Sequence, residues 1–142
     1  MYGRFRWIIP ATLMVMVQAC GFSSADVDVK RIAPEQAKVI IDGRKALLVD
    51  VRTEAEYTDR HIPGTDALIP LQERTRRIQE LDSWKGKPIL LYCRSGNRTQ
   101  QAAKLLPQHG FTDVTDLKGG IQAWMSRGYP TATGPFLPPK AP

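Results

Sequence analysis

The segment from Cys93 to Arg98 (CRSGNR) combines a nucleophile with basic and flexible residues. A cysteine reacts as its thiolate, which is favoured by backbone N–H groups, by the N-terminus of a helix and by nearby arginines. Gly96 allows the loop a positive φ and brings its amides toward the sulfur. The arginines also suit an anionic substrate that approaches a negatively charged sulfur. The segment predicts nucleophilic catalysis by Cys93, with an active loop formed by Arg94, Ser95, Gly96, Asn97 and Arg98.

The alternative interpretation gives Cys93 a buried structural role, as many free cysteines have. The composition of the loop opposes it, because a structural cysteine needs no flanking arginines, glycine and asparagine. An exposed and unused thiol is also a liability in an oxidising compartment. We therefore favour a reactive Cys93, although a cysteine and an arginine separated by four residues are a weak pattern by themselves.

The rest of the chain predicts an α/β domain around this loop. Apolar runs with the length of buried strands occur at 46–49, 67–69 and 89–92, with helical patterns between them. Residues 114–117 are expected to form a last strand. The run at 89–92 is continuously apolar, which is typical of a strand covered on both faces, and it leads directly to Cys93. In such folds ligands bind at the carboxyl ends of the strands. We therefore expect one domain with a mostly parallel central sheet and helices on both faces.

Capping and turn residues place the helices. Thr53 and Glu56 have the spacing of a capping box at a helix start. Pro107 should weaken the last turn of the helix that follows the active loop, and Gly110 should end that helix. The predicted helices cover 32–42, a short stretch after Thr53, 71–81, a stretch around 102–106, and 121–125.

Length, charge and metal-binding residue types limit the function classes. The chain has 142 residues, which suits one domain, and its 20 basic and 14 acidic residues give a net charge of +6. This charge mildly favours anionic ligands but lacks the dense basic face of a nucleic-acid-binding protein. The arginines at 74–77 fit a solvated helix face, with Arg77 paired with Glu73. Two cysteines, two histidines and no glycine-rich nucleotide motif lead us to expect no metal, cofactor or nucleic acid.

Residues 1–25 have the layout of a bacterial signal peptide, with two early arginines, an apolar run at 7–17 and small residues after it. The run is too short to span a bilayer, which takes about 20 residues. Cleavage before Asp26 would release a soluble periplasmic protein. The residues before Cys20 resemble a lipobox, which would make Cys20 a lipidated N-terminus. We favour this interpretation over a buried or incidental cysteine in a discarded peptide, because a cysteine just after the apolar run and preceded by alanine is otherwise hard to explain. Either way we expect an exported protein, periplasmic or lipid-anchored to the cell envelope.

The C-terminal residues 130–142 contain five prolines. This composition predicts an extended tail without a core of its own, and a mobile one. The folded domain is therefore expected to cover 26–129.

Several motifs in a fixed order make the sequence resemble the single-domain rhodaneses, or thiosulfate sulfurtransferases. The resemblance covers about 32–129. Its motifs are Pro34–Ala37, Leu48–Arg52, Glu56–Tyr57, His61–Gly64, Tyr92–Arg98 and Leu117–Trp124. It implies that Cys93 attacks the outer sulfur of thiosulfate, releases sulfite and carries a persulfide, from which cyanide or a thiol takes the sulfur. Related phosphatases and arsenate-handling enzymes have one more residue between the cysteine and the arginine, and this chain has the short loop.

The resemblance also places Asp50 and Arg52 near the site, but a charge pair at a strand end is at least as often structural. We expect His61 to be part of a turn. It is not expected to act as a general base, because a thiolate that attacks sulfur removes no proton. Four places depart from the family pattern. They are Ala33, where serine is frequent, Arg60, where glycine is usual, Thr65-Asp66, where a small residue and asparagine are commoner, and Pro107, which interrupts the helix behind the loop.

Three functions compete at this point. The first is an exported thiosulfate sulfurtransferase with a small anionic sulfur donor and a thiol or cyanide acceptor. The second keeps the persulfide on Cys93 but makes the protein a carrier or sensor that delivers sulfur to a protein partner through its proline-rich tail. The third is a small phosphatase that uses the same cysteine and arginine.

Overall fold

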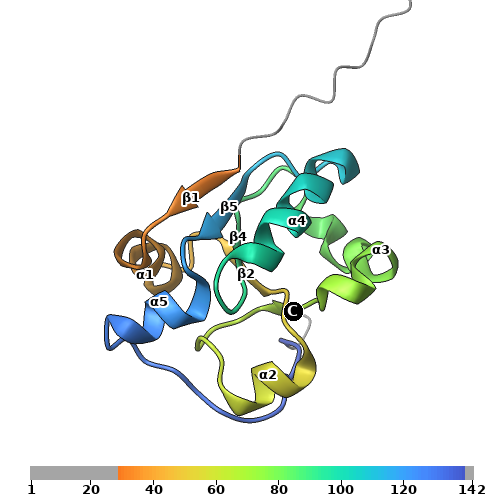
Figure 1. Cartoon of the computed structure of the whole chain (residues 1–142). Helices are drawn as coiled ribbons and strands as arrows, with labels where there is room; N and C mark the ends of the chain where they lie inside the picture. The colour runs from red at the N-terminus through yellow and green to blue at the C-terminus, as the bar shows by residue number, and fades with distance from the viewer. Residues whose placement is uncertain (1–28, 140–142) are drawn as a thin grey trace, which may run out of the picture.

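Five short parallel strands form the central sheet in the computed structural model, which describes residues 29–139. The strands are β1 (Lys30–Ile32), β2 (Leu47–Asp50), β3 (Ala67–Leu68), β4 (Ile89–Tyr92) and β5 (Val114–Leu117). Their order across the sheet is β1-β5-β4-β2-β3, so β4 lies in the middle (Figure 1). The predicted α/β fold with a parallel sheet is confirmed, and Cys93 directly follows the middle strand at its carboxyl end.

Helices cover both faces of the sheet, as predicted (Figure 1). The helices α1 (Pro34–Asp42) and α5 (Gly120–Ser126) lie on one face, and α4 (Asn97–Leu105) lies on the other together with α3 (Arg74–Arg77). The helix α2 (Glu54–Asp59) follows β2 and lies beyond its carboxyl end. Three 3₁₀ segments complete the fold: η1 (Leu71–Glu73), η2 (Ile78–Trp84) and η3 (Leu106–His109).

The side chains of β2 and β4 alternate between two apolar cores. One core contains Leu47, Val49, Ile89, Leu91 and Cys93 and packs against α4 and the segments around α3. The other contains Leu48, Leu90 and Tyr92 and packs against Trp124 and Ile121 of α5. Neighbouring residues of a strand point to opposite faces. Because both faces are covered, these strands are apolar at almost every position.

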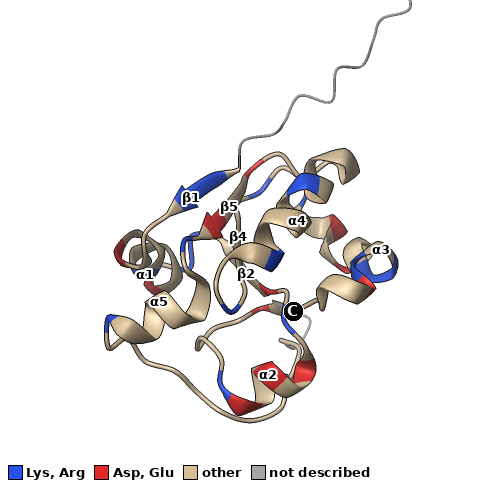
Figure 2. Cartoon of the chain, viewed as in Figure 1, with Lys and Arg blue, Asp and Glu red and all other residues tan. Residues whose placement is uncertain are grey.

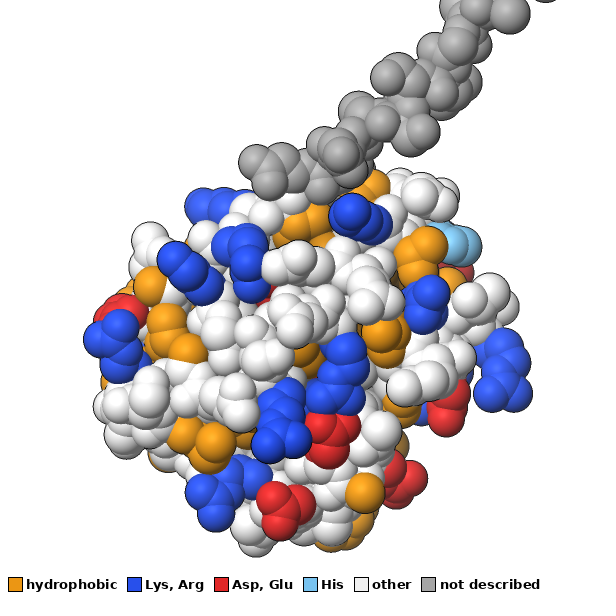
Figure 3. All heavy atoms as spheres, in the orientation of Figure 1, with side chains coloured by type: hydrophobic (Ala, Val, Ile, Leu, Met, Phe, Trp, Pro, Cys, Tyr) orange, Lys and Arg blue, Asp and Glu red, His pale blue; other side chains and the backbone are white. Residues whose placement is uncertain are grey.

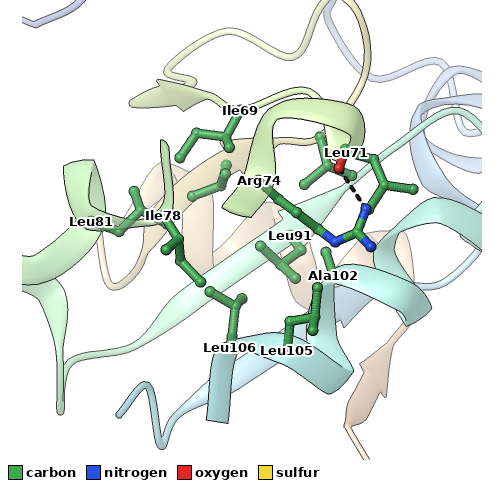
Figure 4. Close-up of a pocket in the computed structure, with 11 residues that line it drawn as sticks. Ile69, Leu71, Arg74, Ile78, Leu81, Leu91, Ala102, Leu105 and Leu106 are labelled. Carbon is green, nitrogen blue, oxygen red and sulfur yellow. Dashed lines mark hydrogen bonds between the residues drawn. The ribbon is translucent and has the colours of Figure 1, made fainter. Parts of the chain in front are cut away.

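A small cavity of about 20 Å³ lies in the first core, between α3 and α4 (Figure 4). Its lining is aliphatic except for Arg74, whose Nη1 donates a hydrogen bond to the Leu71 carbonyl oxygen at 2.6 Å. Neither Cys93 nor a carboxylate lines this cavity. It is therefore a feature of core packing.

Two elements differ from the predictions. Residues 30–32 form β1 and pair with β5, so the first helix begins at Pro34 and not at Ile32. A strand of three residues is too short for its alternation to be read from the sequence. The predicted helix over 71–81 is broken into α and 3₁₀ turns. Only the turn Arg74–Arg77 is α-helical, and tighter 3₁₀ turns precede and follow it.

The proline-rich tail is extended but packs on the domain, which corrects the expectation of a mobile segment for 130–136. Ala132 forms an antiparallel bridge with His61, and the Gly134 amide donates to the Thr58 carbonyl oxygen at 2.8 Å. The ring of Phe136 meets Tyr57 edge-on, with 5.4 Å between ring centroids. The tail thus holds the segment that follows α2.

The predicted leader with Cys20 lies outside the described residues. Within residues 29–139, no helix is long and apolar enough to cross a membrane.

Candidate active site

Cys93 begins a tight loop between β4 and α4, and its sulfur points into that loop. The Gly96 amide donates a hydrogen bond to Cys93 Sγ at 3.0 Å. Gly96 has a φ of +97°, which turns its N–H inward at the start of α4. This is the conformation that the sequence predicts for Gly96. A hydrogen bond from a backbone amide at a helix N-terminus stabilises a negatively charged sulfur at this position.

Thr99 on α4 supports the active loop and is not among the residues predicted from the sequence. This residue is fully buried, and its hydroxyl donates to the Gly96 carbonyl oxygen at 2.9 Å. Its Oγ1 also lies 3.8 Å from Cys93 Sγ. A buried hydroxyl within the first turn of a helix that follows a reactive cysteine is the signal that could have identified it.

The helix α5 holds the loop from the other side through two backbone hydrogen bonds. The amides of Ile121 and Gln122 donate to the carbonyl oxygens of Cys93 and Arg94, at 2.8 and 3.1 Å. Gly120 precedes them with a φ of +59°. A Cβ atom at Gly120 would overlap the Cys93 carbonyl oxygen and lie 2.6 Å from that of Arg94. The Gly119-Gly120 pair is therefore required for α5 to reach the active loop.

We predict that Gly120→Ala destabilises the protein by about 2 kcal/mol or more, because it adds a backbone clash to an unfavourable φ. Gly128→Ala is the matched control, since Gly128 has a similar φ of +69° but nothing within 4 Å of its added Cβ. Chemical denaturation measures both losses. Equal losses in the two variants would contradict the close contact between α5 and the loop.

The two arginines of the loop have different surroundings. Arg98 forms two hydrogen bonds of 2.6 Å with the carboxylate of Glu56 on α2. In Figure 2 basic positions lie at the start of α4 and acidic positions along α2. The charge of Arg98 is therefore largely compensated by Glu56. The predicted role of Arg98 in the active loop stays a prediction. Arg94, Ser95 and Asn97 are exposed, so Arg94 is the loop arginine that an anion can reach.

The Arg98 hydrogen bonds lower the pKa of Glu56 from 4.5 to about 2; burial opposes this shift and bonds from Thr53 add to it. Thr53 also confirms the predicted capping box, because its hydroxyl accepts from the Glu56 amide while its own amide donates to Glu56. Glu56 thus joins the start of α2 to the active loop.

We predict that Glu56→Gln costs about 1 kcal/mol at neutral pH, as expected for a partly exposed, bidentate pair. A lowered pKa in the folded state means that the contribution is present above about 4.5 and is lost as the pH falls to about 2. The stability difference from the unmodified protein should therefore shrink across this range. Glu54→Gln, exposed on the same helix, is the control. If the stability difference between Glu56→Gln and the unmodified protein stays constant down to about pH 2, the lowered pKa of Glu56 would be contradicted.

Asp50 and Arg52 form a buried ion pair under α2. Arg52 Nη2 and Asp50 Oδ2 are 2.7 Å apart, and both side chains are at most 5% exposed. Arg52 also donates to the carbonyl oxygens of Glu56 and Arg60, at 3.3 and 2.8 Å. Burial raises the pKa of Asp50, and the hydrogen bonds and charge of Arg52 oppose this shift. The pair holds the C-terminal half of α2, and these contacts support the structural role that was weighed for it.

His61 also has a structural environment. Its ring stacks on Tyr57 at 3.9 Å between centroids, and its Nδ1 lies 3.0 Å from the Tyr57 carbonyl oxygen. These contacts fit the turn role expected for it and place no base at the loop.

A second residue outside the sequence prediction is Arg31 on β1. Its Nε donates to Asp116 at 2.9 Å, and its Nη2 lies 2.7 Å from the position that a Cβ of Gly96 would take. The sequence does not reveal β1. It therefore could not predict that Arg31 on this strand lies against the active loop.

A groove opens beside the loop, between α2 and α5. Its volume is about 300 Å³, and Arg94, Glu56, Arg60 and Gln122 are among the residues that line it. Basic and acidic side chains lie next to each other on the lower part of the face shown in Figure 3. The site therefore combines a sulfur nucleophile held by an amide, an accessible arginine and an open polar groove.

The chain is similar to known proteins in sequence and in fold. The family model described as Rhodanese-like domain matches residues 33–127. The chain is 31% identical over 128 residues to the uncharacterized protein YibN of Escherichia coli, covering 90% of this chain and 87% of that protein. It is 37% identical over 105 residues to the thiosulfate sulfurtransferase GlpE of Pseudomonas fluorescens, covering 73% and 91%. Among solved structures, a rhodanese-related protein of Thermoplasma volcanium matches with a TM-score of 0.65 at 28% identity, over 72% and 97% of the chains.

Proposed function

Because the chain belongs to the rhodanese-like domain family, we propose that it is a sulfurtransferase that moves the sulfane sulfur of thiosulfate, or of a similar donor, through a persulfide on Cys93. The observation that carries this proposal is the hydrogen bond of 3.0 Å from the Gly96 amide to Cys93 Sγ. It supports a thiolate at the end of the middle strand, where ligands of open α/β sheets bind. Relatives named as sulfurtransferases support the reaction class.

The reaction has two steps that balance without a redox partner. The Cys93 thiolate attacks the outer sulfur of thiosulfate, a new sulfur–sulfur bond forms, and sulfite leaves with the electron pair of the broken bond. Cyanide or a thiolate then attacks the outer sulfur of the persulfide, and Cys93 regains its electron pair. The exposed guanidinium of Arg94 favours the approach of the dianionic donor, and the Gly96 amide stabilises the charge on sulfur.

The test is turnover of thiosulfate and cyanide by the purified full chain, followed as thiocyanate and sulfite in equal amounts. If the protein takes up sulfur but releases no thiocyanate, the proposed enzymatic function would be overturned in favour of a sulfur carrier or sensor. Phosphate release from an aryl phosphate, without thiocyanate, would instead indicate the phosphatase.

We also propose that the protein is exported. The support is the layout of residues 1–25, with early arginines followed by an apolar run and small residues. The mass of the N-terminal peptide, measured on protein from expressing cells, tests the proposed export. A diacylglyceryl group on Cys20 indicates attachment to the envelope, an N-terminus at Asp26 indicates a soluble periplasmic protein, and an unprocessed Met1 contradicts export.

A further inference from the structure

The groove beside the active loop carries more positive than negative free charge. Two of its lining groups are compensated, because Arg52 pairs with Asp50 and Glu56 pairs with Arg98. Arg60 and Arg94 also line it, and neither has a carboxylate partner among residues 29–139.

Asp59 is the remaining acidic group of the groove, and it is exposed. The balance of the uncompensated side chains is therefore two cations against one anion. A small anion is the ligand that this balance favours.

Arg60 reaches across the groove from the end of α2. Its Nη1 lies 3.6 Å from the sulfur of Met125 on α5, while Arg94 approaches from the loop side, next to Cys93. The two guanidinium groups therefore belong to different walls of the same groove. Its volume of about 300 Å³ is at the lower end of small-molecule sites, which run from about 300 to 1,000 Å³.

We propose that this groove binds the carboxylate of a small thiol that accepts sulfur from Cys93, and that Arg60 is a specificity-determining residue for this acceptor. The proposal rests on the sulfur transfer proposed above. The acceptor thiol loses its proton to solvent, and its thiolate attacks the outer sulfur of the Cys93 persulfide. The bond to Cys93 breaks, and its electron pair returns to Cys93. The carboxylate remains in the groove, where the guanidinium groups donate charge-assisted hydrogen bonds to it.

Three acceptors of similar size test the proposal: mercaptopropionate, which is anionic, mercaptoethanol, which is neutral, and cysteamine, which is cationic. At equal thiolate concentrations, we expect a KM for mercaptopropionate about threefold to tenfold below that for mercaptoethanol, as an accessible charged hydrogen bond gives. Cysteamine should have the highest KM. Equal KM values for the three acceptors would overturn the proposal.

Variants of Arg60 separate this site from the reaction itself. Arg60→Gln should remove the preference for mercaptopropionate, Arg60→Lys should keep part of it, and Arg60→Glu should shift the preference toward cysteamine. Arg76→Gln, an exposed arginine on α3, is the matched control and should change nothing. The readout is the ratio of turnover with mercaptopropionate to turnover with mercaptoethanol, because both reactions share the loading of Cys93 by thiosulfate and any effect of a substitution on that step cancels in the ratio. A preference that survives in Arg60→Glu overturns the proposal, whereas loss of cyanide turnover in the unmodified protein would overturn the proposed function.

Discussion

Replacing Cys93 with serine should abolish sulfur transfer and leave the fold intact. A serine hydroxyl is not ionised near neutral pH and forms no persulfide, so no intermediate is available for the second step. We expect turnover of thiosulfate and cyanide to fall by about three orders of magnitude or more, the scale seen when a nucleophile is removed. The measurement is the rate of thiocyanate formation, corrected for the reaction without protein.

The fold should tolerate this change because the sulfur has few polar contacts. Cys93 Sγ accepts from the Gly96 amide and lies near the Thr99 hydroxyl, and a serine oxygen can accept the same hydrogen bond. Thermal unfolding should therefore change little in Cys93→Ser. A serine variant that keeps its turnover would show that another group reacts. If the variant unfolds, its loss of turnover would reflect the lost fold and would not support the nucleophilic role of Cys93.

Asp50→Asn should be the most destabilising polar substitution proposed, at about 3–5 kcal/mol. The change leaves the charge of Arg52 buried without its carboxylate, and Arg52 is only 4% exposed. It also weakens the hydrogen bonds by which Asp50 holds the guanidinium that supports the C-terminal half of α2. Chemical denaturation at neutral pH measures the loss. Asp42→Asn, in an exposed pair with Lys38, should lose about 0.5 kcal/mol or less.

A double-mutant cycle shows whether the loss comes from the unpaired charge. Asp50→Asn combined with Arg52→Met removes both charges, so the double variant should lose clearly less stability than the sum of the two single losses. Strictly additive losses would contradict a coupled ion pair. The loss in Asp50→Asn would then have to come from other contacts of Asp50.

The sequence was most informative where its patterns were long or chemically specific. The apolar runs predicted β2 and β4 because strands buried on both faces need apolar side chains along almost their whole length. The segments 67–69 and 114–117 were also predicted as strands, and they contain β3 and β5. The motif around Cys93 predicted the loop and the φ of Gly96, since both depend on local residue types. The break at Pro107 and the end at Gly110 also follow from local backbone chemistry.

Long-range partners could not be predicted in the same way. The pairing of Arg98 with Glu56 joins residues 42 positions apart, and through it this residue of the active loop also links α4 to α2. The support of the loop by Arg31 depends on β1, whose three residues carry no readable pattern. The tail looked mobile from its prolines, yet its contacts with Tyr57, Thr58 and His61 become visible only when α2 and its following turn are in place.

The most direct test of the account is the mass of the protein after incubation with thiosulfate and removal of the excess. We expect the intact chain to gain the mass of one sulfur atom, with the gain on the peptide that contains Cys93 and none on a peptide that contains Cys20. Addition of cyanide should return the original mass and release thiocyanate. An unchanged mass, or a gain that persists in Cys93→Ser, would contradict a persulfide on Cys93.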